Sequence, residues 1–434
     1  MQTLTVIALV LQVLAPYLFW PSRWNVPAHL NLGFCVTAYI VPGLFTDVWD
    51  LVSPSTNDLY LYVNLFGAIA LVCGMTLGFH SPFHRWLTQK LSPLSAEKID
   101  LKTVTRRVVT LAGGACIGMI LAYMLMGFIP MFAADPLTAK QFKGEYFEPY
   151  QRAAYLFRFS FAIIVAMLTI VLTLWWQSRK RIYLWLAVAM ISLLMISLAR
   201  GASLNGVLVF VGILAARKRS TGIAYVCFLA VIFPVGSASY LILGLLTGIE
   251  RFGSIYSLDS VASIIGSGTP DIADQILFLE GFSNYSPFTY GRTMFGGLVP
   301  SNYMWNPSVW TLTYDNIGAD ISEMVTGGLR LTTAMWGYAN FSWLGVFLIP
   351  ALSGFVTGVF LRTLKGFNFQ GSMVSATLVL MVYMTIGKFF IDFYIMSIHA
   401  LPIIASVMFV CFGFGAKRKR SERAALPIAA EDRT

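Results

Sequence analysis

Residues 155–181, YLFRFSFAIIVAMLTIVLTLWWQSRKR, are the stretch of sequence that decides the fold class. No charged residue lies between Arg158 and Arg179. An α-helix needs about 20 apolar residues to cross the roughly 30 Å hydrocarbon core of a bilayer, and this run is just long enough. The run ends in three consecutive basic residues, Arg179, Lys180 and Arg181, which is typical of a cytoplasmic helix end. The stretch therefore predicts a membrane-spanning helix.

Similar apolar stretches lie on both sides of this one, each bounded by charged residues or by clusters of Pro and Gly. We predict eleven transmembrane helices, at residues 3–20, 29–47, 58–79, 107–129, 155–176, 182–199, 202–216, 221–248, 336–361, 370–391 and 393–415. The predicted fold is all-α and polytopic, and residues 1–434 form a single integral membrane domain.

The composition of the whole chain supports this class. Of the 434 residues, 57% are hydrophobic and only 12% are charged, whereas soluble domains carry about 25% charged residues. The mean hydropathy is +0.72. These values exclude a soluble enzyme, a nucleic-acid-binding domain and a disordered chain. Membrane lipid is therefore the expected surrounding, and nucleic acid is not an expected partner in spite of the net charge of +10.

Basic residues predict the orientation of the helices. Connections of one parity, together with the basic tail at residues 416–434, hold 21 of the 30 Lys and Arg residues, whereas connections of the other parity are acidic. Positively charged loops stay in the cytoplasm. The N-terminus is therefore expected outside and the C-terminus in the cytoplasm of a multi-pass protein, and an even number of helices would break the alternation.

One outer connection is too long to be a turn. Residues 249–335, between the eighth and ninth predicted helices, form a loop of 87 residues that is rich in Gly, Ser, Tyr and Trp. Loops this long usually carry function or are disordered, and the aromatic content argues against disorder. We expect this loop on the extracytoplasmic side.

Arginines on the outer side are the strongest functional signal, because the distribution of basic residues disfavours them there. Arg200 lies between two predicted helices, and the next helix, at 202–216, is so short that Arg200 is expected at or below the outer headgroup level. Arg152 and Arg158 lie at the start of the fifth helix. Each of the three either binds an anion in a cavity or anchors a helix end by snorkelling.

The long loop contains three arginines, among them Arg292 and Arg330, and eight acidic residues. An acidic loop does not bind polyanions in general, but a few arginines can hold one phosphate bidentately while a carboxylate moves a proton. Most of the acids are expected to be solvated.

Lys388, Asp392 and His399 lie near the outer end of the tenth helix. The spacing of four residues puts Lys388 and Asp392 on one helical face. Lys388 and Asp392 are either functional or form an ion pair that only neutralises their two charges. His399 is either functional or packs between helices. No pattern of His, Cys or carboxylate residues predicts a metal site, and no cofactor-binding motif is present.

Three segments resemble a known family. They are Ala199-Arg200-Gly201, then Tyr290-Gly291-Arg292-Thr293 with Leu298-Val299-Pro300 and Trp305-Asn306-Pro307, and finally Gly337-Tyr338-Ala339-Asn340-Phe341-Ser342-Trp343-Leu344-Gly345. Together with the layout of residues 150–415, they resemble the Wzy-type O-antigen polymerases of bacterial inner membranes, which share a fold class with the O-antigen ligases. In this family's pattern, an acid stands where this chain has Trp336-Gly337, and a glycine stands where it has Ser342.

This resemblance implies a GT-C-like, inverting glycosyltransferase that needs no metal ion or cofactor and polymerises repeat units linked to undecaprenyl diphosphate. Its implied partners are lipid-linked oligosaccharides, a chain-length regulator and a flippase. Charge on the leaving diphosphate needs fixed cations, and the acceptor hydroxyl needs a base. The candidates for the base are Glu323, Asp320, Asp392 and His399. The candidates for the cations are Arg200, Arg292, Arg330, Arg152, Arg158 and Lys388.

Two other functions remain open from the sequence. A transporter or flippase of lipid-linked or anionic solutes would use the arginines without needing a base. An O-antigen ligase would attach the polymer to a lipid core, but residues 249–335 contain no histidine for the family's histidine-containing loop motif.

Overall fold

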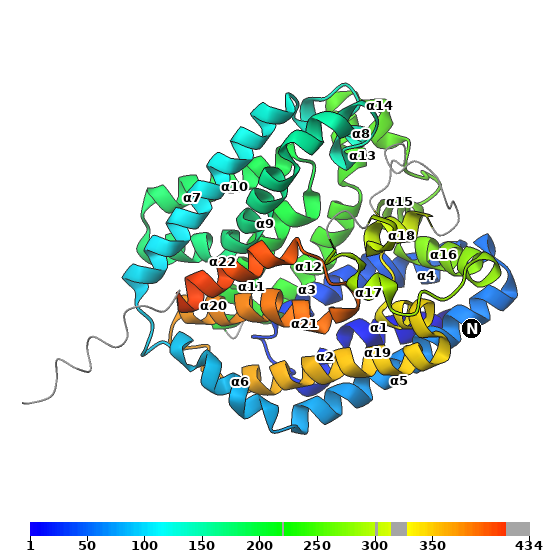
Figure 1. Cartoon of the computed structure of the whole chain (residues 1–434), viewed down its shortest axis with the longest axis horizontal. Helices are drawn as coiled ribbons and strands as arrows, with labels where there is room; N and C mark the ends of the chain where they lie inside the picture. The colour runs from blue at the N-terminus through cyan, green and yellow to red at the C-terminus, as the bar shows by residue number, and fades with distance from the viewer. Residues whose placement is uncertain (219–220, 300–302, 314–327, 414–434) are drawn as a thin grey trace, which may run out of the picture.

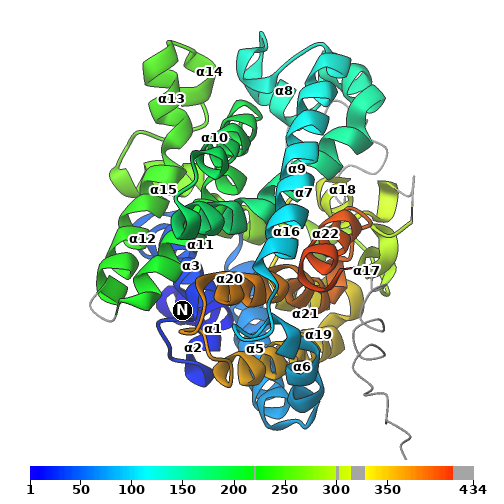
Figure 2. The same ribbon diagram turned by 90° about the vertical axis from the view of Figure 1, so that its left-hand side faces the viewer.

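The computed structural model describes residues 1–218, 221–299, 303–313 and 328–413. Within these ranges the chain is helical, and the only β-type pairing is an isolated bridge between Gly297 and Ser397. Figures 1 and 2 show one assembly of packed helices, in which the first helix and the end of the last one lie at opposite ends of the view in Figure 1.

Every predicted apolar stretch contains a helix. Among the described residues, seven helical spans are long and apolar enough to cross a membrane. They are α3–η1–α4 (Val26–Phe45), α5 (Pro54–His80), α7 (Leu101–Met126, with the span continuing to Phe132), α9 (Phe147–Ser178, with the span starting at Gly144), α11 (Arg200–Arg217), α19 (Thr333–Lys365) and α20–η8–α21 (Met373–Ile391). The pair α12 (Gly222–Ser237) and α13 (Ser239–Thr247) forms an eighth if its 56° bend is allowed. Three apolar helices are shorter: α1 (Gln2–Leu14), α10 (Arg181–Ile196) and α22 (Ala400–Phe412). The chain is therefore a helical polytopic membrane protein, while eleven crossings and their orientation stay predictions.

Local sequence explains where the long helices begin and end. The Ser53 hydroxyl and the Asp100 carboxylate accept hydrogen bonds from the first free backbone N–H groups of α5 and α7. Pro54 occupies the first position of α5, where no backbone donor is needed. Helix α7 ends at Gly127, whose φ of 73° suits glycine.

The pair α5 and α19 packs backbone against backbone along the lower edge of Figure 1. A Cβ added to Gly74 would lie 2.0 Å from the carbonyl oxygen of Ala351, and one added to Gly358 would lie 2.2 Å from that of Met75. Small residues permit this approach, and close packing drives helix association in lipid, where the hydrophobic effect between helices is absent.

The described part of the long loop is folded onto the helices. It contains α14 (Glu250–Gly253), α15 (Val261–Gly268), α16 (Asp271–Tyr285), α17 (Arg292–Gly296), η7 (Tyr303–Trp305) and α18 (Pro307–Thr313). The Tyr60 hydroxyl of α5 donates a 2.6 Å hydrogen bond to Gln275 of α16. Phe282 and Trp310 pack with Trp336 of α19 in one buried cluster. Trp310 is only 7% exposed and belongs to the core, whereas Tyr290 is 72% exposed.

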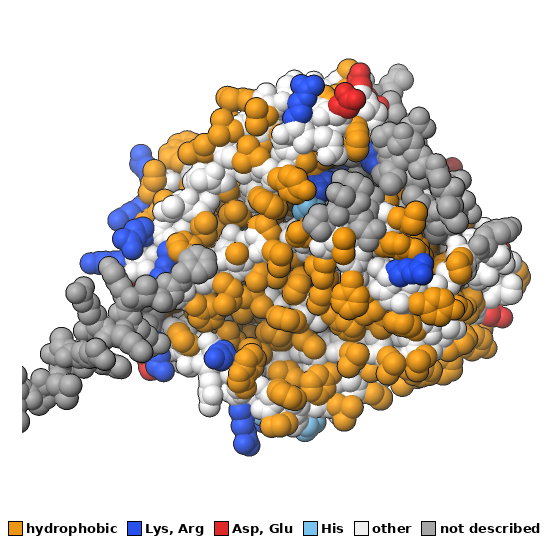
Figure 3. Space-filling view, in the orientation of Figure 1, with side chains coloured by type: hydrophobic (Ala, Val, Ile, Leu, Met, Phe, Trp, Pro, Cys, Tyr) orange, Lys and Arg blue, Asp and Glu red, His pale blue; other side chains and the backbone are white. Residues whose placement is uncertain are grey.

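The surface has a broad apolar area and a separation of charge. Figure 3 shows hydrophobic side chains over most of the visible face, with Lys and Arg gathered at the left edge and acids at the top and right. Large side chains such as Met124, Ile223 and Leu245 are more than two-thirds exposed, which is typical of a surface that faces lipid. The basic edge agrees with the charge asymmetry of the sequence.

Candidate functional site

Arg200 is held at the turn between α10 and α11 by main-chain carbonyl groups. Its Nη1 donates to Gly236 and Ser237 at 3.2 and 2.9 Å, and its Nη2 donates to Gly268 at 2.7 Å. The guanidinium carbon also lies 4.4 Å from the ring centre of Tyr240. The C-terminal ends of α12 and α15 leave such carbonyls unpaired and carry partial negative charge. Arg200 therefore joins two helix ends as well as facing a cavity.

This cavity, which we call the Arg200 cavity, collects three cations. It has a volume of about 430 Å³ and is lined by Arg200, Lys140 and Arg330 together with the polar side chains of Asn205 and Thr269. No carboxylate is present among the residues that line it within the described ranges. A cavity of this size with a net positive lining is suited to a multiply charged anion.

Lys140 comes from α8 (Pro136–Gln141), in the connection between α7 and α9. Its Nζ lies 4.8 Å from the ring centre of Tyr240, the same ring that Arg200 contacts. Burial, followed by repulsion from Arg200 and Arg330, lowers the pKa of Lys140 to about 8. A negative charge that enters the cavity would therefore stabilise the ammonium form of Lys140.

Arg330 reaches the cavity from the end of the long loop. Its side chain is 70% exposed and forms a 3.4 Å ion pair with Asp271, which is only 3% exposed. Gln275 donates a 2.6 Å hydrogen bond to the carbonyl oxygen of Arg330. Burial raises the pKa of the Asp271 carboxyl, and the charge of Arg330 opposes that rise. Burial also raises the pKa of Asp274 to about 6, with a further contribution from Asp271.

Lys388 and Asp392 lie at a change in helix geometry. The segment η8 (Tyr383–Gly387) is a π-helical turn, and α21 (Lys388–Ile391) follows it directly. Such turns recur at functional sites. The two side chains form no ion pair within 4 Å in the described structure. The sequence alternative in which Lys388 and Asp392 only neutralise each other is therefore not observed. Burial raises the pKa of Asp392, while Lys388 and a 3.4 Å hydrogen bond from Tyr394 oppose that rise.

Two further cavities open beside this pair. The Lys388 cavity, of about 340 Å³, has a largely apolar lining from α9, α11, α20 and α22 in addition to Lys388 and Asp392. The inner cavity, of about 420 Å³, also reaches Lys388 and Asp392, and the rest of its lining mixes apolar side chains with polar ones such as Gln12, Ser353 and Thr357.

Asn205 is common to all three cavities. It lies five residues after Arg200 on α11, which corresponds to about 7.5 Å along the helix. Its side chain is exposed to the cavities and forms no hydrogen bond with any residue in the described ranges. The cation-lined space and the space beside Asp392 therefore meet at a free amide.

His399 is paired with Arg158. The Arg158 Nη1 donates to the Nε2 of His399 at 2.8 Å, and the Arg158 Nε donates to the Tyr150 hydroxyl. Burial and then the charge of Arg158 lower the pKa of His399. The ring is therefore neutral with its proton on Nδ1, and this buried atom has no partner within the described residues. Because Nε2 already accepts from Arg158, His399 is a weaker candidate for the base than Asp392.

Two segments that carry the family resemblance are docked to each other. The buried Asn340 accepts hydrogen bonds at its Oδ1 from Thr289, from the backbone N–H of Gly291 and from Thr293, at 2.6 to 3.0 Å. Gly291 has a φ of 83°, which glycine adopts readily. This arrangement sets Arg292 at the start of α17, exposed and 5.0 Å from the ring centre of Trp305.

Helix α19 is broken at Phe341 and Ser342. Ser342 has φ 54° and ψ −146°, a backbone conformation that is essentially restricted to glycine. Across this break Gly337 and Gly345 touch, since a Cβ on Gly345 would lie 1.9 Å from the carbonyl oxygen of Gly337. A glycine at position 342 would adopt this conformation without strain, whereas this chain holds it with serine.

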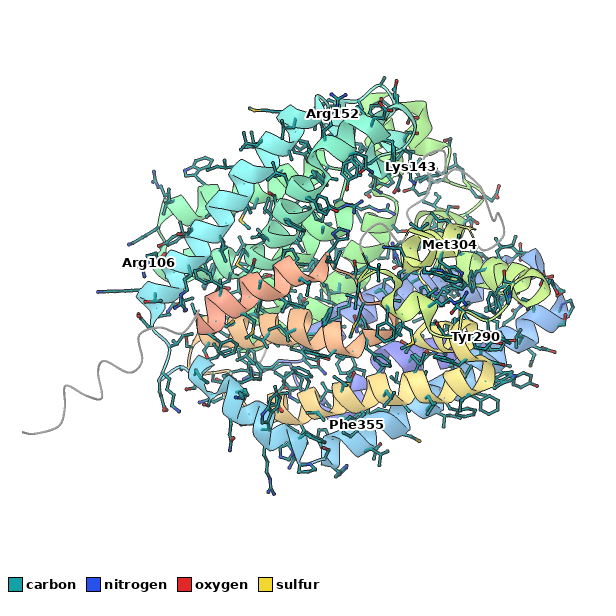
Figure 4. The ribbon with its side chains drawn as sticks, viewed as in Figure 1. Arg106, Lys143, Arg152, Tyr290, Met304 and Phe355 are labelled. Atoms are coloured by element: carbon teal, nitrogen blue, oxygen red, sulfur yellow. The ribbon has the colours of Figure 1, made fainter. Side chains whose placement is uncertain are left out.

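The structure divides the predicted site residues into separate groups. Arg200 and Arg330 share one cavity, Lys388 and Asp392 share two others, and Arg158 pairs with His399. Arg292 lies on Trp305 and lines none of these cavities. Arg152 is exposed at the upper edge of Figure 4, far from the labelled Tyr290 of the long loop. Glu323 and Asp320 lie outside the described residues.

Sequence reasoning missed Lys140, Asn205 and Asn340. Lys140 could have been found by the rule that drew attention to Arg200, because it is a basic residue in an acidic outer connection. Asn205 and Asn340 carry no comparable signal, because an uncharged amide is not disfavoured on either side of the membrane.

No three His, Cys, Asp or Glu residues within the described ranges come together in a way that could hold a metal ion. The sequence matches no family model, and neither the curated proteins nor the solved structures contain a match. The resemblance to Wzy-type polymerases therefore rests on the three motif segments and the layout of the chain.

Proposed function

We propose that the chain is a glycosyltransferase that joins oligosaccharide repeat units carried on undecaprenyl diphosphate, at the outer face of a bacterial inner membrane. The observation that carries this proposal is the arrangement of the cavities. A space with three cations and no lining carboxylate in the described ranges adjoins, at Asn205, a space with an accessible carboxylate. Displacement of a diphosphate by a sugar hydroxyl needs these two features.

The transfer step would divide between the two spaces. The acceptor hydroxyl attacks the anomeric carbon of the donor sugar, its proton passes to a carboxylate, and the bond between that carbon and the diphosphate oxygen breaks. Negative charge then grows on the leaving diphosphate, where Arg200, Lys140 and Arg330 supply fixed positive charge.

Asp392 is the proposed base. Its raised pKa makes it a stronger base than a solvated carboxylate, and it borders both the Lys388 cavity and the inner cavity. Asp320 and Glu323 remain alternatives, and they belong to the same proposal because the long loop also provides Arg330.

One observation favours transport as a second candidate. The inner cavity is lined by Thr357, which lies roughly four helical turns beyond the break at Ser342 on α19, and by Met75 near the end of α5. Polar groups at this depth are expected along a substrate pathway. A flippase or transporter would use the same cations without breaking a bond.

The test is reconstitution of the purified protein in liposomes with lipid-linked repeat units and no nucleotide sugars. A polymerase lengthens the glycan and releases one undecaprenyl diphosphate for each new bond. A transporter moves the substrate across the bilayer and releases none. A ligase transfers glycan only when a lipid core acceptor is added, and either of these last two results would overturn the proposal.

A further inference from the structure

The three cations of the Arg200 cavity differ in how their charges are used. Arg200 donates hydrogen bonds to carbonyl groups of α12 and α15, and Arg330 is paired with Asp271. The Nζ of Lys140 forms no hydrogen bond or ion pair with any residue in the described ranges. Its charge faces the ring of Tyr240 at 4.8 Å. Lys140 is therefore the cation with the most uncommitted charge at the cavity.

The groups around Lys140 do not neutralise it. Arg200 and Arg330 face it across the cavity, and Tyr240 approaches from α13. On its own helix, the Asp135 carboxylate caps the N-terminus and accepts hydrogen bonds from Thr138. The neighbouring segments η4 (Pro130–Phe132) and η5 (Gly144–Tyr146) contribute one acid, Glu145, which is exposed and whose carboxylate acts on the neighbouring Tyr146.

The pKa of about 8 follows from these surroundings. Burial is the larger cause and repulsion by the two arginines is the smaller one, and both favour the neutral amine. A bound anion would act in the opposite direction, because it stabilises the ammonium form and offsets the two arginines.

We propose that Lys140 is the principal residue that recognises the diphosphate of the lipid-linked donor, and that the donor binds together with a proton in alkaline solution. This inference rests on the proposed function, since the lipid diphosphate is the donor named there. It extends that function by assigning the recognition to the uncommitted amine and by making donor binding depend on pH.

The direction of the pH dependence follows from the two states of Lys140. Below about pH 7 the free amine is already charged, so binding takes up no proton at this site. Above about pH 8 the free amine is largely neutral while the bound form is still mostly charged, so binding weakens as the pH rises, by about tenfold in all if the charge contributes that much to affinity. The sugar-linked donor has no phosphate proton that is lost in this range, and free undecaprenyl diphosphate loses its last proton at pH ~6, so neither contributes to the alkaline change.

The experiment measures binding of undecaprenyl diphosphate to the purified full-length protein in detergent, between pH 6.5 and 9.5. The wild-type protein should lose affinity above pH 8. Lys140→Arg should bind with little change across this range, because arginine stays charged. Lys140→Ala should bind about tenfold more weakly at pH 7 and show no alkaline loss. Lys143→Ala, in the same connection but outside the cavity lining, is the matched control and should behave as the wild type.

The possible outcomes distinguish a failure of the Lys140 inference from a failure of the proposed function. If the wild-type protein binds the lipid diphosphate and Lys140→Ala binds it equally well, the inference is overturned and the proposed function stands. If the wild-type protein binds no lipid diphosphate, the proposed donor fails and the inference fails with it. Inorganic diphosphate provides the last arm, and binding as tight as that of the lipid would overturn recognition of a lipid headgroup. A folded Lys140→Arg variant that keeps the wild-type alkaline loss would also overturn the role of Lys140.

Discussion

The Arg200 cavity and the Lys388 cavity share Asn205, yet they offer different chemistry. The first is lined by three cations and, within the described ranges, by no carboxylate. The second contains one cation and one carboxylate in an otherwise largely apolar lining. Fixed positive charge can hold an anion but cannot accept a proton, whereas a partly buried carboxylate of raised pKa can accept one.

This difference teaches that the basic residues singled out in the sequence are not equivalent in position. Arg200, Arg330 and Lys140 line one cavity, while Arg292 and Arg152 carry the same charge elsewhere. If the two cavities divide the reaction as proposed, variants on each side should fail in different ways.

Asp392→Asn should have the largest effect. The amide keeps the size of the side chain but removes the base, so turnover in the liposome assay should fall by about 10²- to 10⁴-fold while undecaprenyl diphosphate still binds. Asp259→Asn, a change at an exposed loop carboxylate, is the control. Full turnover in Asp392→Asn together with a loss in Glu323→Gln would move the base to the long loop and break the comparison.

Arg200→Lys should come next. A lysine cannot serve the carbonyls of both α12 and α15 and also face the cavity, so turnover should fall about 10- to 100-fold and the melting temperature should drop. Arg106→Lys is the matched control, because Arg106 is exposed and lines none of the three cavities. An Arg200→Lys variant with wild-type turnover would show that Arg200 serves only as a helix anchor.

Asn205→Ala should have a moderate effect that sharpens the comparison. Losing one hydrogen bond to a sugar hydroxyl costs about 1 kcal/mol, or roughly fivefold, which should appear in KM for the acceptor and leave donor binding intact. Asn284→Ala, at an exposed position of α16, should change neither quantity. An increase in the donor Kd alone would mean that Asn205 belongs to the Arg200 cavity only.

Arg152→Ala should have the smallest effect, within about twofold of the wild type in turnover. Its side chain is exposed and lines none of the three cavities, so its charge is screened by solvent. The same liposome assay provides the measurement. A loss comparable with that of Arg200→Lys would show that an outer positive charge matters wherever it lies, and would remove the distinction between the cavity and the surface.

The sequence by itself determined the class of fold. Runs such as residues 159–178 leave no choice but lipid burial, because their length and lack of charge match the hydrocarbon core. The described helices cover the predicted stretches, and seven of the spans are long enough to cross a membrane. The excess of basic residues in alternate connections also marked Arg200 as unusual before any contact was known.

Only the tertiary structure decided which of these residues act together. Lys140, Arg200 and Arg330 come from three distant parts of the chain, and nothing in local sequence relates them. Asn340 joins the long loop to α19 through hydrogen bonds across about 50 residues of chain. The structure also showed that Arg200 donates hydrogen bonds to two helix ends, whereas the Lys140 ammonium group forms no hydrogen bond or ion pair with the described residues. Hydropathy and charge act locally and can be read along the chain, whereas the partners of a side chain depend on how helices pack, which is a property of the whole molecule.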